Sequence, residues 1–205
     1  GVAFTRLRDA GDPLELALAY AGEGADELVL LDISATEEGR GTAVDVARRV
    51  SSALSIPLTV GGGIADLDDI RRVLDAGASK ISINTAAVRH PELVRSAADV
   101  FGRDRIVVAI DAAAAPDAHA RDDEGGGKWV VCTRGGKQRT QLDLIEWACT
   151  VERLGAGEIL LTSIDRDGAV DGYDLPQLRA VTEAVGIPVI ASGGAGALQH
   201  FRGAL

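Results

Sequence analysis

An internal repeat with a shift of 131 residues is the feature of this 205-residue sequence that most limits its possible folds. Residues 24–64 align with residues 155–195 without a gap, and 13 of the 41 aligned positions are identical. Both copies open on an apolar run that follows a glycine (GADELVLLDI and GAGEILLTSI), and both close on Ile-Pro, a second apolar run and a glycine pair. Two equivalent halves of this kind predict an α/β protein with a repeating strand–helix unit.

Short apolar runs alternate with amphipathic stretches along the whole chain. The predicted strands are residues 27–33, 58–60, 80–83, 105–111, 158–164 and 189–191. The predicted helices are residues 13–21, 42–53, 67–76, 91–101, 142–154, 175–184 and a last one that begins near Leu198. The strands are apolar on both faces, which is typical of parallel strands covered by helices on each side.

Two halves of four strand–helix units each would close a (βα)₈ TIM barrel, and this is the fold class that we predict. The repeat shift puts the partner of the strand at 105–111 before residue 1, and the partner of the strand at 80–83 after residue 205. We therefore expect residues 1–205 to form one partial barrel domain of about six strand–helix units, without the first and last strands. A typical barrel of this class has roughly 250 residues.

Residues 112–136 interrupt the alternation of strands and helices. This segment is longer than a usual loop between a strand and a helix, and it is rich in charge and glycine. Residues 128–133 alternate in polarity like a strand, which predicts a hairpin insertion at the barrel mouth. Two interpretations remain open, a mobile insertion and a lid that covers a substrate.

Charge and composition exclude several classes of function. The chain has 21 basic and 31 acidic residues, a formal charge of −10, which argues against nucleic acid and anionic membranes as partners. No apolar run approaches the roughly 18 residues that a membrane span needs. Two cysteines, Cys132 and Cys149, are too few for a disulfide framework and favour the cytoplasm. The three histidines do not cluster, so we expect no metal site.

Polar residues gather where the predicted strands end, which is the active-site face of such barrels. Asp111 ends the most apolar strand, and apolar surroundings raise the pKa of a carboxyl group toward the range of a general acid or base. A loop-capping role for Asp111 is the alternative. Glycines 61–63 and 193–194 follow strands in the two halves, and such loops bind phosphate through backbone amides. A substrate with two phosphates would bridge them.

Three charged residues open otherwise apolar strands at the opposite pole of the barrel. Glu27, Lys80 and Glu158 begin alternate strands of the expected barrel, so they could form one layer at its floor. From their spacing alone, a structural ring of ion pairs is the favoured interpretation.

Six motifs together resemble the cyclase subunit family of imidazole-glycerol-phosphate synthase, from histidine biosynthesis. The motifs are GADELVLLDI, VGGGI, ISINTAAV, VVAIDA, GAGEILLTSIDRDG and IPVIASGGAG. The resemblance extends over the chain except for part of residues 112–127. The related phosphoribosyl-formimino isomerase shares the half-barrel repeat, but INTAAV and TSIDRDG are closer to the cyclase.

The resemblance implies a role for each candidate site residue. Asp111 would be one of two catalytic aspartates, the other lying on the first strand that we expect the chain to lack. Residues implied around the two phosphates are Gly63, Asn84 and Thr85 for one, and Gly168 and Gly194 for the other. Those implied to line the substrate cleft are Asp32, Thr162, Asp167 and Ser192. Glu27, Lys80 and Glu158 would form a gate through which ammonia enters, instead of a structural ring.

The resemblance also implies a reaction and a partner. Ammonia from a glutaminase subunit, bound at the barrel floor as a heterodimer, would react with a bisphosphorylated phosphoribulosyl-formimino-aminoimidazole carboxamide ribonucleotide. The products would be imidazole glycerol phosphate and aminoimidazole carboxamide ribonucleotide, with no cofactor and no metal. Two alternatives remain: the isomerase, which needs neither ammonia nor a partner, and a barrel fragment that binds phosphates or the glutaminase without turnover.

Overall fold

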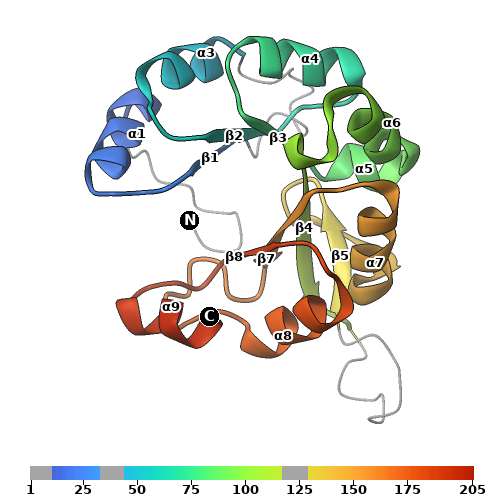
Figure 1. Cartoon of the computed structure of the whole chain (residues 1–205). Coiled ribbons are helices and arrows are strands. Elements are labelled where there is room, and N and C mark those ends of the chain that lie inside the picture. The colour runs from blue at the N-terminus through green and yellow to red at the C-terminus, as the bar shows by residue number, and fades with distance from the viewer. Residues whose placement is uncertain (1–10, 33–43, 117–128) are drawn as a thin grey trace.

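The computed structural model describes residues 11–32, 44–116 and 129–205, which form one sheet with helices packed around its outside (Figure 1). The strands are β1 (Leu28–Leu31), β2 (Leu58–Gly61), β3 (Lys80–Ile83), β4 (Ile106–Ala114), β5 (Trp129–Thr133), β6 (Gln138–Asp143), β7 (Glu158–Ser163) and β8 (Val189–Ser192). The helices are α1 (Pro13–Gly22), α3 (Val44–Ala53), α4 (Leu67–Asp75), α5 (Thr85–Arg89), α6 (Glu92–Phe101), the 3₁₀ turn η1 (Arg103–Arg105), α7 (Leu144–Leu154), α8 (Leu175–Ala184) and α9 (Leu198–Ala204).

Six of the strands are parallel and follow the order β1–β2–β3–β4–β7–β8. Figure 1 shows this curved sheet inside a ring of helices that is open between α1 and α9. The arrangement confirms the strand–helix barrel that the sequence predicts, with all six expected strands present. Within the described ranges β1 pairs only with β2, and β8 only with β7. The expected lack of a first and a last strand stays a prediction.

The sequence repeat has a counterpart in the strand register and the helix positions. Leu28 lies opposite Leu58 in the β1–β2 pair, and their repeat equivalents Ile159 and Val189 lie opposite each other in the β7–β8 pair. Helices α1, α3 and α4 begin at positions that are equivalent to the first residues of α7, α8 and α9. The two halves of the chain therefore share one local fold, as the repeat predicts.

Three of the differences from the prediction have a clear local reason. Strand β4 continues three residues past Asp111, because this end pairs with the antiparallel strand β5. Helix α7 begins at Leu144 instead of residue 142, since Asp143 is its N-cap and its carboxylate accepts the backbone N–H of Ile145. The short helix α5 was not predicted, because its five residues are too few to show a helical period.

Alternate residues of the strands face two different surroundings. Side chains such as Ile81, Val108 and Ile159 belong to the large apolar core that includes the helices. Val107, Ala109 and Leu160, with the half-buried Ile190, form a separate small cluster on the other face of the sheet. Because side chains alternate along a strand, Asp111 and Thr162 lie on the face of this second cluster. The barrel interior is therefore apolar in its middle and polar at the strand ends.

Candidate functional site

Three candidate residues lie in one row at the carboxyl ends of neighbouring strands. Asp111 of β4 is opposite Thr162 of β7, and Thr162 is opposite Ser192 of β8. Asp111 and Thr162 are buried, whereas Ser192 is half-buried. The register thus brings together three side chains, of which Asp111 and Ser192 are 81 positions apart in the sequence. Their grouping agrees with the prediction that polar residues gather where the strands end.

The carboxyl group of Asp111 is held near neutrality by opposing effects. Its pKa is raised from 3.8 to about 7, mainly by burial. A hydrogen bond of 2.9 Å from Asn84 Nδ2 to Asp111 Oδ2, and one from the backbone of Gly136, act to lower the pKa, while the negative charge of Asp167 raises it. A carboxyl group with a pKa of about 7 is both donor and acceptor of protons near neutral pH. This is the acid/base candidate that the sequence indicates.

Asn84 lies beside Asp111, a contact that the sequence does not predict. Its Nδ2 donates to the carboxylate, and its Oδ1 is buried with no hydrogen-bond partner among the described residues. The resemblance implies a phosphate contact for Asn84. The observed geometry instead joins its amide group to the acid/base candidate, and the phosphate role stays a prediction.

The first glycine loop follows β2 and packs closely on the residue after β1. Gly62 and Gly63 have φ angles of 95° and 71°, which favour glycine. A Cβ atom at Gly62 would lie 2.1 Å from the backbone oxygen of Asp32, so no larger residue fits there. Asp32 also donates its backbone N–H to the oxygen of Gly61. The loop therefore holds Asp32 and Gly63 at the same end of the barrel as Asn84.

The second glycine loop follows β8 and is equivalent, by the sequence repeat, to the first loop. Gly194 has a φ angle of 97°, and a Cβ atom there would lie 2.1 Å from the backbone oxygen of Gly172. Gly172 in turn donates its backbone N–H to Gly194. The segment that carries Asp167 and Gly168 thus packs directly on the second loop. The candidate phosphate residues Gly168 and Gly194 therefore lie on neighbouring segments, while their ligand remains a prediction.

At the amino ends of the strands, the three charged candidates form an ion-pair cluster. Lys80 Nζ lies 2.9 Å from Glu27 Oε2 and 2.7 Å from Glu158 Oε1. Burial acts to lower the pKa of Lys80, but the hydrogen bonds and charges of Glu158 and Glu27 outweigh it and raise the pKa. Thr59 also donates its hydroxyl to Glu27 Oε1 over 2.8 Å, a contact that was not predicted. The sequence places the three charges correctly in one layer.

Other reactive groups in the described ranges do not form a second site. The thiol of Cys132 is fully buried, and burial followed by the charge of Asp111 raises its pKa to about 11, which keeps it protonated. Across residues 11–32, 44–116 and 129–205, no three His, Cys, Asp or Glu side chains gather as metal ligands. In the same ranges, no helix is long and apolar enough to span a membrane.

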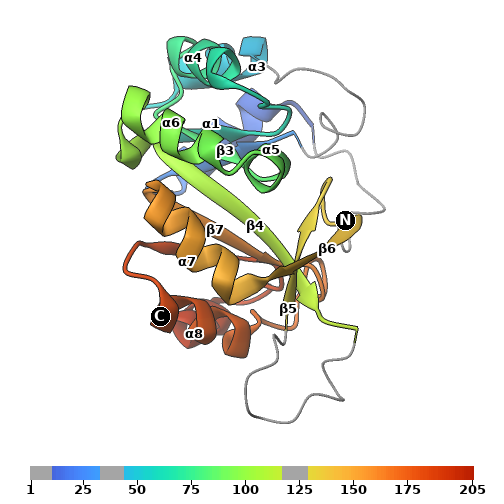
Figure 2. The same ribbon diagram turned by 90° about the vertical axis from the view of Figure 1, so that its right-hand side faces the viewer.

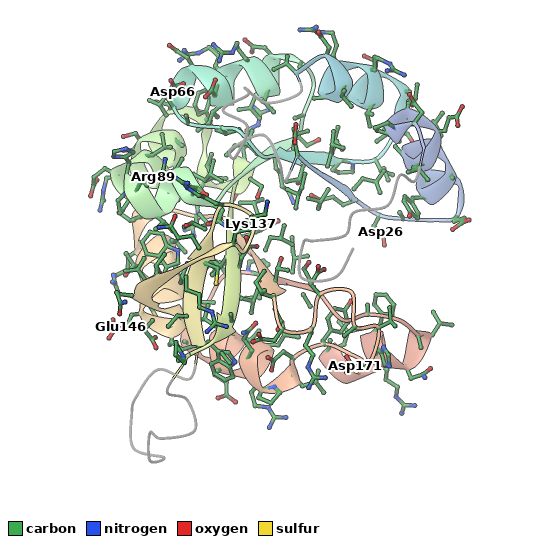
Figure 3. The ribbon with its side chains drawn as sticks, turned by 180° about the vertical axis from the view of Figure 1, so that it is seen from behind. Asp26, Asp66, Arg89, Lys137, Glu146 and Asp171 are labelled. Carbon is green, nitrogen blue, oxygen red and sulfur yellow. The ribbon has the colours of Figure 1, made fainter. Side chains whose placement is uncertain are left out.

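The hairpin of β5 and β6 lies at the carboxyl end of β4 (Figure 2). The sequence indicates the strand that ends at Thr133, while Lys128 and the rest of residues 117–128 lie outside the described residues. In Figure 3, Lys137 of the hairpin turn lies between the half of the ring that carries Asp66 and the half that carries Asp171. The Gly-Gly pair that precedes Lys137 is the signal from which this turn could have been predicted.

Comparison with known proteins supports the assignment that this geometry suggests. The family model described as "Histidine biosynthesis protein" matches residues 1–205. The chain belongs to this family. A relative from Geobacillus thermodenitrificans, named imidazole glycerol phosphate synthase subunit HisF, is 58% identical over 98% of this chain and 77% of its own length.

Other relatives of the histidine biosynthesis family have the same name. The subunit HisF of Synechococcus sp. (strain CC9605) is 58% identical over 100% of this chain and 77% of its own length. That of Anoxybacillus flavithermus is 56% identical over 98% of this chain and 77% of its own length. The chain therefore spans about three quarters of the relatives that it matches.

Proposed function

We propose that this chain is the cyclase subunit of an imidazole glycerol phosphate synthase, a lyase of histidine biosynthesis. The proposal is supported by the family match over residues 1–205 and by named relatives that are 58% identical over 98–100% of this chain. The single structural observation that carries it is the buried Asp111 in the carboxyl-terminal half of the central strand β4, whose carboxyl group has a pKa of about 7. A ring-closing reaction with ammonia needs a group of this kind to move protons at neutral pH.

In this proposal Asp111 transfers protons while ammonia adds to the bisphosphorylated substrate and the imidazole ring closes. Asn84 holds the carboxyl group, and Thr162 and Ser192 line the cleft beside it. The loops at Gly63 and Gly194 bind the two phosphates through backbone amides, with Thr85 beside the first and Gly168 beside the second. Asp32 and Asp167 line the substrate cleft. The apolar middle of the barrel keeps water away from the reacting atoms.

The ion-pair cluster at the other end suits the entry of ammonia. The relatives are named as subunits, which implies a complex with a second subunit. We propose that this partner is a glutaminase that docks at the amino ends of the strands, where Glu27, Lys80 and Glu158 form the gate. The aligned inner positions between Lys80 and Asp111 are small or apolar, such as Val107 and Ala109. Neutral ammonia crosses such surroundings more readily than ammonium.

The test is turnover of the phosphoribulosyl-formimino substrate with ammonium salt as nitrogen source. We expect imidazole glycerol phosphate to form only with ammonium present, and Asp111→Asn to lower turnover by about 10²–10⁴-fold. Conversion of the substrate into its phosphoribosyl isomer at a rate that does not depend on ammonium would favour the isomerase alternative. Turnover of Asp111→Asn at the rate of the unaltered chain would remove Asp111 from the mechanism.

A further inference from the structure

The turn of the β5–β6 hairpin, residues 134–137, contacts the candidate site but has no role in the function proposed above. We propose that this turn is a positioning element for Asp111, which it holds through a backbone hydrogen bond from Gly136 while it is itself anchored on Thr85. The proposal rests on the acid/base role of Asp111 in that function.

The pairing of β4 explains why the turn reaches the site. Strand β7 pairs with β4 from Val107 to Ala112, so it occupies one edge of β4 along this whole length. Strands β3 and β5 must therefore share the other edge, β3 up to Val108 and β5 from Asp111 onward. Because β5 runs antiparallel to β4, its chain continues from Cys132 back toward the end of β3. The hairpin turn is thus carried onto the residues that follow β3.

Two backbone donors of the turn meet side chains of the site. The N–H of Arg134 donates to Thr85 Oγ1 over 3.0 Å, and Thr85 is buried in the first turn of α5. The backbone of Gly136 forms a hydrogen bond with the carboxylate of Asp111. One contact fixes the turn on the segment after β3, and the other links it to the acid/base candidate.

The backbone of the turn has an unusual conformation. Arg134, Gly135 and Gly136 have consecutive φ angles of 54°, 61° and 75°. Arginine rarely adopts a positive φ, and its presence there shows that surrounding contacts hold the backbone.

The turn and Asn84 together give Asp111 two donors in an apolar setting. Both donors favour the ionised carboxylate, whereas burial favours the neutral acid. Removal of one donor should therefore move the balance toward the neutral form and leave the carboxyl group less well oriented. A hairpin that only covers Asp111 would act through burial, so its removal would lower the pKa of Asp111 instead of raising it.

The test replaces residues 134–137 with Asn-Gly, which shortens the loop from four residues to two and keeps Thr133 opposite Gln138. The pKa of Asp111 is measured by ¹³C carboxyl NMR, with the signal assigned by its absence in Asp111→Asn. We expect the pKa to rise by roughly half a unit or more above that of the unaltered chain. Gln138→Ala, an exposed change in the same hairpin, is the control and should leave the pKa unchanged.

A second pair of variants covers the case in which the shortened hairpin does not fold. Thr85→Val removes the acceptor of Arg134 at nearly constant volume, and Thr85→Ser retains it. We expect the pKa of Asp111 to rise in the first and to stay in the second. Where turnover is measurable, kcat should fall several-fold in the shortened hairpin with KM little changed.

Two results would overturn the proposal. One is a folded chain, with the hairpin shortened or with Thr85→Val, in which the pKa of Asp111 is unchanged or lower. The other is a rise in KM alone in the chain with the shortened hairpin, which would make the turn a substrate contact. The NMR titration needs no substrate, so it tests the positioning role even if the unaltered chain fails to form imidazole glycerol phosphate, a result that would refute the proposed function separately.

Discussion

Asn84 donates its side-chain N–H to the carboxylate of Asp111 over 2.9 Å, and this contact joins the ends of two adjacent parallel strands. The donor side of the amide is satisfied in this way, whereas the amide oxygen is buried without a partner in the described part of the chain. A buried acceptor without a partner is costly and calls for an explanation. A reacting N–H group of the substrate would satisfy it, so we expect Asn84 to act in catalysis, in addition to the phosphate contact that the resemblance implies.

Replacement of Asn84 should therefore change the chemistry more than the affinity. Asn84→Ala removes a donor that favours ionised Asp111, so we expect the pKa of Asp111 to rise above about 7 and the acidic limb of the kcat profile to move to higher pH. A pH–rate profile with both kcat and KM measures this. Ser82→Ala is the control, because Ser82 is buried two residues before Asn84 and its side chain points to the same face of the sheet. We expect this variant to leave the pKa of Asp111 unchanged. A large rise in KM with an unchanged profile would indicate that Asn84 serves the phosphate instead.

Asp111 should also reduce the stability of the fold at neutral pH. Its pKa is about 7 in the folded chain and near 3.8 in the unfolded chain, so the folded state binds more protons between these values. The free energy of unfolding must then fall as the pH rises from about 4 to about 7, and this loss persists above pH 7.

Asp111→Asn should remove this pH dependence. We expect the variant to match the unaltered chain near pH 4 and to exceed its stability by up to about 4 kcal/mol at pH 8. Urea unfolding at the two pH values provides the measurement. A stability difference that does not grow with pH would contradict the raised pKa.

Most of the fold could be predicted because the repeat and the alternation of apolar runs are local patterns with a physical cause. The pairing of β1 with β2 and of β7 with β8 follows from the same 131-residue shift that aligns their sequences. The layer of Glu27, Lys80 and Glu158 was predictable because each residue begins a strand of known direction. What a charge cluster does is not encoded in its spacing, so its role came only from the resemblance.

The contacts of the site that depend on strand length could not be predicted. Strand β4 extends beyond the end of β3, and β5 pairs with this extension. For this reason the turn at Arg134 contacts Thr85. The direction of the Asn84 amide likewise depends on its neighbour Asp111, which is 27 residues away in the sequence. Such contacts join separate elements, and a pattern within one element does not reveal them.

The glycine at position 62 should be required for the first loop for a steric reason as well as a conformational one. Gly62→Ala places a Cβ atom 2.1 Å from the backbone oxygen of Asp32, whereas Gly24→Ala at nearly the same φ angle meets no atom within 4 Å. We expect Gly24→Ala to cost about 1–2 kcal/mol for its backbone conformation and Gly62→Ala about 1–3 kcal/mol more. Thermal unfolding of the two variants compares these costs, and equal costs would contradict the close packing of the loop on Asp32.

The ion-pair cluster should matter more for ammonia delivered by a partner than for ammonia supplied in solution. Lys80→Met removes the cation between Glu27 and Glu158 and leaves two partly buried carboxylates close together. We expect a loss of about 1–3 kcal/mol of stability and a several-fold fall in glutamine-driven turnover in the complex, with a smaller fall in turnover fed by ammonium salt. Thr59→Val, which removes only the hydroxyl that donates to Glu27, should have the same effect in weaker form. Both nitrogen sources are compared in parallel assays of the same preparations. If both rates fall by the same factor in Lys80→Met while Thr59→Val behaves as the unaltered chain, the cluster is a structural ring of ion pairs and the gate is refuted.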